Sequence, residues 1–408
     1  MAGQQGQGLC PSHVPVLDFF PGHGKNGCKA QFLSDGSSGP GMWIIPITTC
    51  CGSYDVQKKF LLKDKTDKMH IKEFTASQSA DGEKGPNFWI KLNIDQTGFY
   101  RVKYDDELAA GLENAIKSQK LSLMDKIGIV EDSYALSVAC KQTVTSLLRL
   151  LNAYRNESDY TVLSHVTSVC LSISKISFDA TPDLNKDIKR LLINLLLPTA
   201  KKLSWDCKDG ESHLDVMLRS LLLTALVKLG HDETINEGVR RFHIFLGDRK
   251  TSLLPPDTRK AAYLAVMRTV STSSGAGYDA LLKIYRETAE AQEKSRVLGS
   301  LSSSPDKEMV LEALNFMLTD EVRNQDSFYI LGGISLEGRE VAWTWLKFTS
   351  EAKAAEVSEF FAGCIKPSFE RALKQSLERV RISARWIESI RSEPSLGQTV
   401  HELLQSGV

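Results

Sequence analysis

Apolar and polar residues alternate in two different ways along this chain, and the change comes roughly a quarter of the way in. Up to residue 108 the alternation has a period of two in short runs, as in strands with one buried face. From 109 to 408 apolar residues recur every three or four positions, which predicts amphipathic helices. We therefore predict a mainly α fold, with a small β-sandwich at 31–108 followed by a large superhelical domain of the HEAT or armadillo kind at 109–408.

The clearest strand candidates are Phe88–Asp95 and Phe99–Tyr104, which flank a short loop. Gly98 in this loop can adopt positive φ, so we predict a hairpin. Within the first run the apolar residues Ile90, Leu92 and Ile94 would face one way, and the polar residues Lys91, Asn93 and Asp95 the other. Further strands are predicted at Val14–Phe20, Met42–Cys51, Phe60–Leu62 and His70–Phe74.

Caps and prolines mark the ends of several predicted helices. Ser212, followed three residues later by Asp215, resembles an N-terminal cap. Pro255–Asp257 opens another helix, because proline is tolerated in the first turn. A long amphipathic helix is predicted at 368–392, between two prolines. The helical pattern carries no tetratricopeptide or ankyrin signature, so any repeat is degenerate.

Composition and charge narrow the class of protein. The formal charge is zero, because 50 Lys and Arg residues balance 50 Asp and Glu residues. Neutralising phosphates needs a basic excess, so no nucleic acid partner is expected. No apolar run reaches about 18 residues, which predicts no membrane span. The missing secretory signal and the low cysteine content favour a cytoplasmic location. Residues 1–30 are rich in Gly, Pro and Gln and are predicted to be disordered or atypical.

Motifs for catalysis are incomplete in this sequence. His401–Gln405 begins the H-E-x-x-H zinc pattern but ends on Gln, which is not an ordinary zinc ligand. A second set has the ligand types and outer spacings of a zinc site: Cys10, His13, His23 and Cys28. Its Gly- and Pro-rich context offers no secondary structure to preorganise a site, so chance spacing is the preferred interpretation. We therefore predict no metal site on this chain.

Several helical residue types have both a binding and a structural interpretation. A guanidinium can hold a carboxylate through two hydrogen bonds, but exposed helical arginines also form pairs such as Glu378 with Arg381. The arginines concerned are Arg240, Arg241, Arg371, Arg379, Arg381, Arg385 and Arg391. Three tryptophans either pack between helices or line a peptide groove: Trp343, Trp345 and Trp386. Three cysteines in apolar patterns are predicted core residues: Cys140, Cys170 and Cys364.

Four short motifs follow one another in a fixed order. Trp43–Thr48 is similar to a W-x-[IV]-P strand, and Tyr100–Asp105 to a Y-R-V-x-Y-D strand. Gly338–Trp343 and Arg381–Trp386 are two later helical motifs. Together they resemble the C-terminal half of zinc aminopeptidases of the aminopeptidase N and puromycin-sensitive type, and the plant form most of all. The resemblance starts near Gln31 and continues almost to the last residue.

This resemblance implies part of a zinc metallopeptidase that releases N-terminal residues from peptides. In that family a thermolysin-like domain precedes the sandwich and carries H-E-x-x-H, a further Glu ligand, a G-A-M-E-N strand and a catalytic Tyr. None of these has a counterpart in this sequence, and residues 1–30 depart from the family pattern. Zinc is therefore expected in the full-length family and not on this chain. We expect the chain to be a truncated form that has no aminopeptidase activity by itself.

The resemblance also implies a role for the helical domain, which in the family caps the catalytic cleft and admits peptides. On this basis Arg381 and Arg385 are the candidates for peptide contacts. The expected partners are peptides and a catalytic domain or full-length homologue. The residues by themselves leave an alternative, in which the chain is a non-catalytic helical solenoid that binds peptides or proteins and regulates them.

Overall fold

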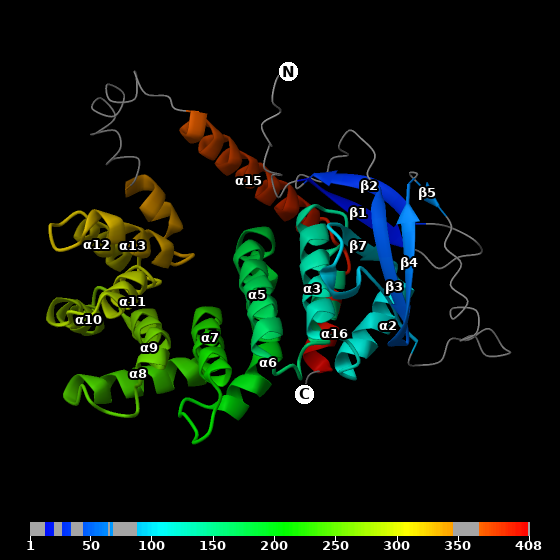
Figure 1. Ribbon diagram of the computed structural model, residues 1–408. Coiled ribbons are helices and arrows are strands. Elements are labelled where there is room, and N and C mark those ends of the chain that lie inside the picture. Colours follow the sequence, from blue (N-terminus) through cyan, green and yellow to red (C-terminus); the bar gives the residue numbers. More distant parts are fainter. Residues whose placement is uncertain are drawn as a thin grey trace, which may run out of the picture. The chain divides into compact units, whose positions relative to one another are not determined.

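The computed structural model of this chain describes residues 13–19, 27–33, 44–63, 66–67, 88–345 and 367–406. It divides into two compact units, unit 1 (Met1–Pro198 with Lys374–Val408) and unit 2 (Thr199–Leu373). The predicted fold class is confirmed, because a small β part is followed by a large helical part (Figure 1). The predicted boundaries at 31–108 and 109–408 stay predictions, and the segment 1–30 lies largely outside the described residues.

Within the described residues the β part of unit 1 forms one four-stranded sheet, of order β5-β2-β1-β7, and one three-stranded sheet, of order β4-β3-β6. The strands are β1 His13–Phe19, β2 Gly27–Leu33, β3 Ile45–Cys51, β4 Ser53–Leu62, β5 Thr66–Asp67, β6 Ile90–Leu92 and β7 Arg101–Tyr104. Within the described residues the strands predicted at Val14–Phe20 and Met42–Cys51 are confirmed as β1 and β3, and Phe60–Leu62 is the end of the longer β4, whereas His70–Phe74 lies outside the described residues.

The predicted hairpin between Phe88–Asp95 and Phe99–Tyr104 is wrong. β6 pairs with β3, whereas β7 pairs in parallel with β1 in the other sheet. The cause is Asn93, whose backbone adopts the left-handed conformation at φ 57° and ψ 56°. The chain therefore leaves the strand and forms the 3-10 turn η1, Ile94–Gln96.

Hydrogen bonds of a side chain stabilise this turn, whereas the sequence predicts a turn made by a glycine with positive φ. The Asn93 side-chain amide donates to the carbonyl oxygens of Gly98 and Tyr100 at 2.9 and 3.0 Å, and it accepts from the Gly98 N–H at 2.7 Å. Positive φ falls on Asn93, Asp95 and Gln96 rather than on Gly98. Because Asn tolerates this conformation better than other residues with a side chain, Asn93 is the residue that separates the two sheets.

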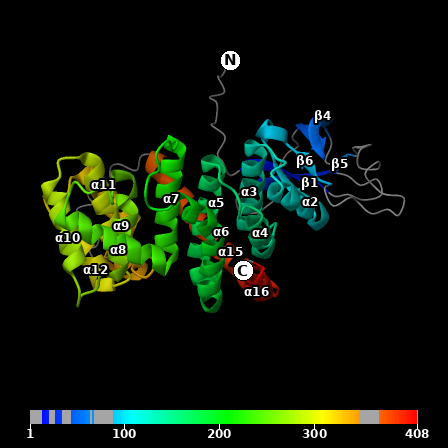
Figure 2. The ribbon, with the colours of Figure 1, turned by 90° about the horizontal axis from the view of Figure 1, so that it is seen from below.

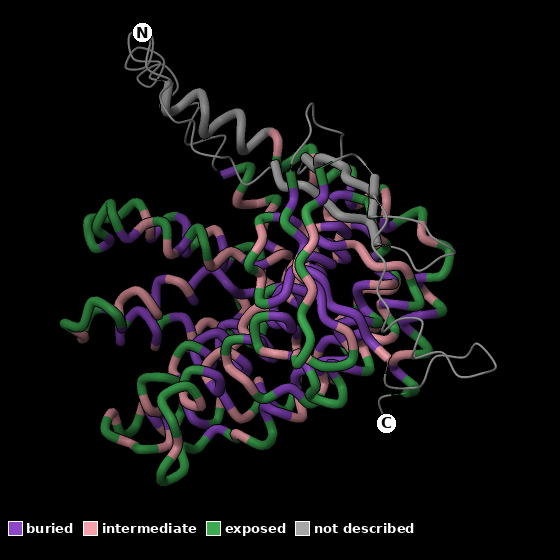
Figure 3. The backbone as a smooth tube through the Cα atoms, turned by 45° about the vertical axis from the view of Figure 1, so that its right-hand side comes forward, coloured by how far each residue is buried: buried purple, intermediate pink, exposed green. Residues whose placement is uncertain are grey.

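Four helices of unit 1 begin at a side chain that caps free backbone N–H groups, namely Asp105, Ser122, Thr143 and Asp159. The helices lying in unit 1 are α2 Asp106–Lys117, α3 Leu123–Val138, α4 Val144–Asn152, α5 Tyr160–Ala180 and α16 Leu396–Gln405. Helices α6 (Asn185–Leu203) and α15 (Pro367–Arg391) each continue across the division between the units. In Figure 3 buried and exposed stretches alternate along the helices, as their amphipathic sequences require.

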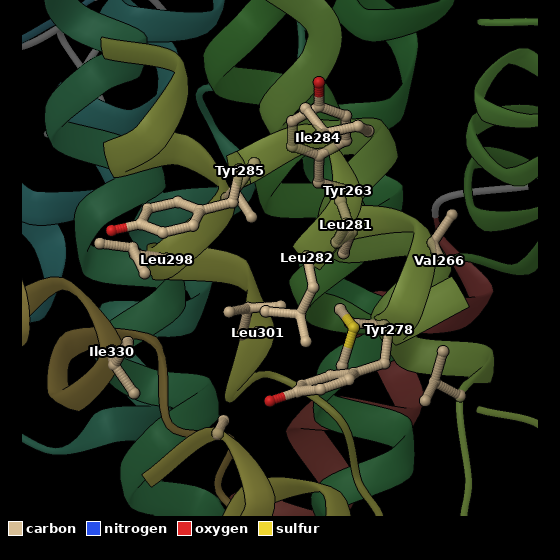
Figure 4. Packing of buried hydrophobic residues seen from close by; sticks show 14 of the residues in the cluster. Tyr263, Val266, Tyr278, Leu281, Leu282, Ile284, Tyr285, Leu298, Leu301 and Ile330 are labelled. Carbon is tan, nitrogen blue, oxygen red and sulfur yellow. The ribbon is translucent and has the colours of Figure 1, made fainter. Parts of the chain in front are cut away.

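Unit 2 is built of helices that pack on near neighbours in the sequence. They are α7 His213–Leu229, α8 Asp232–Gly247, α9 Pro256–Thr269, α10 Ala276–Glu287, α11 Ala291–Leu301, α12 Lys307–Met317 and α13 Ser327–Gly333. Helix α9 packs against α7, α8 and α11, and α11 in turn against α10 and α13. The shared core includes Tyr263, Leu281 and Leu301, which Figure 4 labels. The cap at Ser212 and Asp215 and the start at Pro256 are confirmed.

Helix α5 is long and apolar enough to cross a membrane by length and composition, whereas the apolar runs of the sequence predict no span. In this structure 56% of its apolar window is buried, and the helix packs against α3. A core helix has the same length and composition, so this feature does not test the prediction.

Candidate peptide-binding face on helix α15

The long helix predicted at 368–392 is confirmed as α15. Arg381 and Arg385 are both exposed on it, whereas Trp386 and Ile390 are buried, with exposed fractions of 5% and 2%. Successive residues of a helix are rotated by about 100°, so Arg381 and Arg385 share one side and the two buried residues lie on another. Among residues 378–391, helix α15 therefore has a packed side and an exposed basic side.

Helix α3 receives the packed side of α15. Trp386 meets Tyr134 edge to face, with 5.8 Å between the ring centroids. The Cys140 thiol donates to the backbone carbonyl of Arg385 at 3.7 Å. Cys140 is exposed and has φ 57°, so its prediction as a core residue is wrong because α3 ends there in a left-handed turn. Cys170 is buried as predicted, and Cys364 lies outside the described residues.

Arg391, the last residue of α15, and Glu393, two residues beyond it, hold opposite ends of two other helices. Arg391 donates to the carbonyl oxygens of Asp179 and Ala180, at the C-terminal end of α5, at 2.9 and 3.3 Å. The Glu393 carboxylate accepts from the N–H groups of Val144 and Thr145, at the start of α4, at 2.8 and 3.0 Å. We call Arg391 and Glu393 the clasp. It joins residues about 210 to 250 positions apart in the chain.

Helix α16 continues this packing onto α4 (Figure 2). Arg149 of α4 donates to the Thr399 hydroxyl at 3.3 Å and lies 4.0 Å from the Glu402 carboxylate. His401 and Gln405, the two ends of the incomplete zinc pattern, face each other one turn apart with 2.8 Å between their nitrogens. The helix has the right geometry for that motif, but the second imidazole is absent.

A buried ionic cluster joins the sheets to helix α3. Lys91 and Asp125 are only 1% and 0% exposed, and Lys91 Nζ lies 3.2 Å from Asp125 Oδ1. The Tyr54 hydroxyl donates to Asp125 Oδ2 at 2.6 Å, and the Asp95 N–H donates to Oδ1 at 2.8 Å. Burial and the bond to Asp125 raise the pKa of Tyr54. We call these contacts, together with those of Asp132 below, the β–α3 junction.

Asp132 makes the second half of the β–α3 junction. It accepts from the Val102 N–H at 2.9 Å and from Arg101 Nη1 at 3.1 Å. Burial raises the pKa of the Asp132 carboxyl to about 6, although the Arg101 charge opposes that shift. Arg101 and Val102 belong to the Y-R-V-x-Y-D motif, and its last residue, Asp105, caps α2. This motif therefore fastens β7 to two helices.

Other arginines that the sequence singled out are used inside unit 2. Arg241 forms a two-pronged ion pair with Asp206 at 2.7 and 2.9 Å. It also pairs with Glu237, as does Arg240. Hydrogen bonds from the two arginines lower the pKa of Glu237 to about 2. Because Arg240 and Arg241 already hold carboxylates of this chain, they are not candidates for peptide contacts.

Two of the three tryptophans are buried, as the structural interpretation predicts, and the third is exposed. Trp345 is buried and donates to Asn315 Oδ1 at 2.9 Å, and Trp386 is buried against α3. Trp343 is 59% exposed on the helical motif that begins at Gly338. At Gly338 an added Cβ would come within 2.7 Å of Val310, so close packing explains the glycine that opens this motif.

The zinc of the family has no fitting ligand set in the part of the chain that the structure describes. No group of three or more His, Cys, Asp or Glu side chains is placed there to hold a metal ion. Cys10 and His23 lie outside the described residues, as do the side chains of His13 and Cys28. No catalytic step is therefore assigned to zinc on the described residues.

Comparison with known proteins places these features in a family. The ERAP1-like C-terminal domain family matches residues 89–348. Aminopeptidase M1-B of Oryza sativa subsp. japonica is 78% identical and is matched by 94% of this chain over 47% of its own length. Aminopeptidase M1 of Arabidopsis thaliana is 51% identical, over 92% of this chain and 46% of that protein. Puromycin-sensitive aminopeptidase of Caenorhabditis elegans is 28% identical, over 89% and 41%.

The chain thus spans about half the length of the curated relatives it matches. The family resemblance carried by the four motifs is confirmed, including its plant character. This chain therefore belongs to the ERAP1-like C-terminal domain family and corresponds to a C-terminal part of an M1 aminopeptidase.

Proposed function

We propose that this chain supplies the cleft-capping, peptide-admitting half of a zinc aminopeptidase and has no aminopeptidase activity alone. The main support is the match to about half of proteins named aminopeptidases. In this proposal the other half of such an enzyme holds the zinc ion and performs proteolysis, whereas the helical part controls which peptides enter.

The proposed peptide contacts are Arg381 and Arg385. Both are exposed and lie one helical turn apart, and the other side of α15 packs on α3 through Trp386. Two guanidinium groups so placed can pair with carboxylates of a peptide. Because the pairs are exposed, we expect salt to weaken the binding.

Exposed apolar side chains support a partner domain. Large ones on and beside the sheets are Ile44, Val56, Leu61, Phe99, Leu123 and Met124, with exposed fractions from 45% to 65%. We propose that a catalytic domain, or a full-length homologue, covers some of them. The isolated chain should then self-associate in light scattering, and a monodisperse monomer over a wide concentration range would count against this proposal.

We also propose a cytoplasmic location. Cys50, Cys140, Cys170 and Cys207 form no disulfide among the described residues. Thiols of this kind suit a reducing compartment.

The direct test measures turnover of fluorogenic Leu and Ala substrates by the purified chain, with and without a zinc chelator. We expect no chelator-sensitive turnover. Addition of the separately produced remaining half of rice aminopeptidase M1-B should give a complex by gel filtration and chelator-sensitive turnover. The matched control is that half alone.

Two results would contradict the proposal. Turnover by the chain alone that the chelator abolishes would point to metal ligands on this chain, and Cys10, His13, His23 and Cys28 would be the first to mutate. Failure of the two halves to associate, together with binding of peptides by the chain, would favour the non-catalytic solenoid.

A further inference from the structure

We propose that Arg391 and Glu393, the clasp, are positioning residues that fix the peptide-binding side of α15. The inference rests on the proposed function, because it concerns where Arg381 and Arg385 meet a peptide. Neither clasp residue would touch the peptide itself.

The clasp supplies charges that two helices lack. Helix α5 has no basic residue in its last turn, and Arg391 donates to two of its terminal carbonyl groups. Helix α4 has no acidic residue in its first turn, and Glu393 accepts from its first two N–H groups. A cation at a helix C-terminus and an anion at an N-terminus are the favourable arrangement for both helix dipoles. The clasp therefore binds α4 and α5 in one defined position.

All early donors of α4 are satisfied only when Glu393 is present. The Ser146 N–H bonds to the capping hydroxyl of Thr143 at 3.1 Å, which leaves those of Val144 and Thr145 for the carboxylate. The Thr145 hydroxyl adds a third bond to the same carboxylate at 3.1 Å. A glutamine at position 393 would have only one acceptor oxygen. Its NH₂ group would face a backbone N–H of α4 where the second carboxylate oxygen now accepts. Position 393 therefore requires a carboxylate with two acceptor oxygens, which an arbitrary surface charge would not supply.

The position of the clasp controls the arginines through a stiff helix. From Ser368 to Arg391, helix α15 contains neither Gly nor Pro. At about 1.5 Å per residue, Arg385 and Arg381 lie roughly 9 and 15 Å before Arg391. A slip of α15 by one residue rotates every side chain by about 100°, which would turn both arginines away from their present side. The clasp, with Trp386 against Tyr134, selects one register.

The test measures binding of a fluorescent peptide with two Glu residues, and of its Gln analogue, to the full chain by anisotropy. We expect Glu393→Gln to weaken binding of the acidic peptide about five-fold, because the carboxylate contacts are lost, with little change for the analogue. Glu388→Gln is the matched control: Glu388 is exposed and accepts from Arg391 Nη1 at 2.7 Å, but among the described residues no hydrogen bond or ion pair joins it to α4 or α5.

A second readout follows the register of α15 without peptide. The alkylation rate at Cys140, mapped by mass spectrometry in a Cys207→Ser background, should rise in Glu393→Gln because the thiol loses the Arg385 carbonyl. Arg391→Lys should retain more binding than Arg391→Met, since it keeps the charge at the end of α5. If Glu393→Gln does not fold, Arg391→Lys alone should still weaken binding about two-fold by losing the guanidinium fork, and unchanged binding would overturn the inference.

The outcomes separate this inference from the proposed function. If Arg381→Ala with Arg385→Ala weakens acidic peptide binding and Glu393→Gln does not, while Cys140 alkylation rises, the clasp is structural only and the inference is overturned. If the double arginine variant binds the peptide as the unaltered chain does, the proposed peptide contacts are wrong, and the inference falls with them.

Discussion

The β–α3 junction and the clasp both join distant segments of unit 1, but they place charge in different surroundings. At the junction Lys91 and Asp125 are almost fully buried, so each charge depends on the other. At the clasp Arg391 has about half of its side chain exposed, and it bonds the exposed carboxylate of Glu388 as well as the end of α5. Water therefore screens the clasp much more than the junction. The difference leads us to expect that the junction contributes more to the free energy of unfolding than the clasp does.

The largest effect is expected from Lys91→Met. Asp125 would stay buried without its cation, which should lower the free energy of unfolding by roughly 3–5 kcal/mol. Urea unfolding measures this change. Lys91→Met with Asp125→Asn is the control, because it removes the unpaired charge and should be less damaging than Lys91→Met alone. Equal stability of the two variants would contradict the buried-charge explanation.

The next effect concerns Asp132 and pH. Its pKa rises from 3.8 to about 6 on folding, so the folded state holds the proton more tightly. This group therefore stabilises the fold most below pH 4, and that contribution is lost as pH rises through about 6. Between pH 4 and a pH well above 6, the free energy of unfolding should therefore fall by up to about 3 kcal/mol through this group.

Urea unfolding of the unaltered chain and of Asp132→Asn, between pH 4 and 7, tests this sign. Asn keeps an acceptor for the Val102 N–H but does not titrate. The difference in unfolding free energy between the two chains should shrink or reverse as pH rises. A constant difference across the range would show that Asp132 does not titrate there.

A smaller effect is expected at the clasp. Glu393→Gln and Arg391→Met should each lower the free energy of unfolding by about 1 kcal/mol, the usual size of a charge at a helix end. Thermal unfolding at low salt measures it, and added salt should reduce it. Glu388→Gln should change stability by less than about half of that. If a clasp variant lost as much unfolding free energy as Lys91→Met does, the clasp and the β–α3 junction would not differ in the way we describe.

The smallest effect is expected for Arg149→Met. Arg149 and Glu402 are each about half exposed, and their charged atoms are 4.0 Å apart. Such a surface pair contributes about 0–1 kcal/mol, so we expect a change below half of that range in urea unfolding. A loss above about 1 kcal/mol would mean that packing of Arg149 beside Thr399 matters more than its charge.

Local features were predictable from the sequence, whereas contacts between distant segments were not. The cap formed by Ser212 and Asp215 depends on residues three positions apart and was predicted. The hairpin failed because Asn93 turns the backbone through side-chain bonds that alternation does not reveal. Lys91 was predicted on a polar side, but Asp125 neutralises it in the interior.

The candidate site shows the same division. The helix that carries Arg381 and Arg385 was predicted, because its pattern and its flanking prolines are local. The clasp was missed, since Glu393 finds its partners 248 and 249 residues earlier in the chain. The peptide-contact role of the two arginines stays a prediction, which the anisotropy measurements test.

The clasp has a consequence for biosynthesis. The start of α4 leaves the ribosome 249 residues before Glu393 does. At about 5–20 residues per second, the free N–H groups of α4 wait on the order of ten to fifty seconds for their acceptor. During this time α3 lacks Trp386 of α15, and α4 lacks the residues of α16 that later pack on it. Until residues 391–405 have been made, α3 and α4 of the nascent chain are therefore more exposed to aggregation than they are in the finished fold.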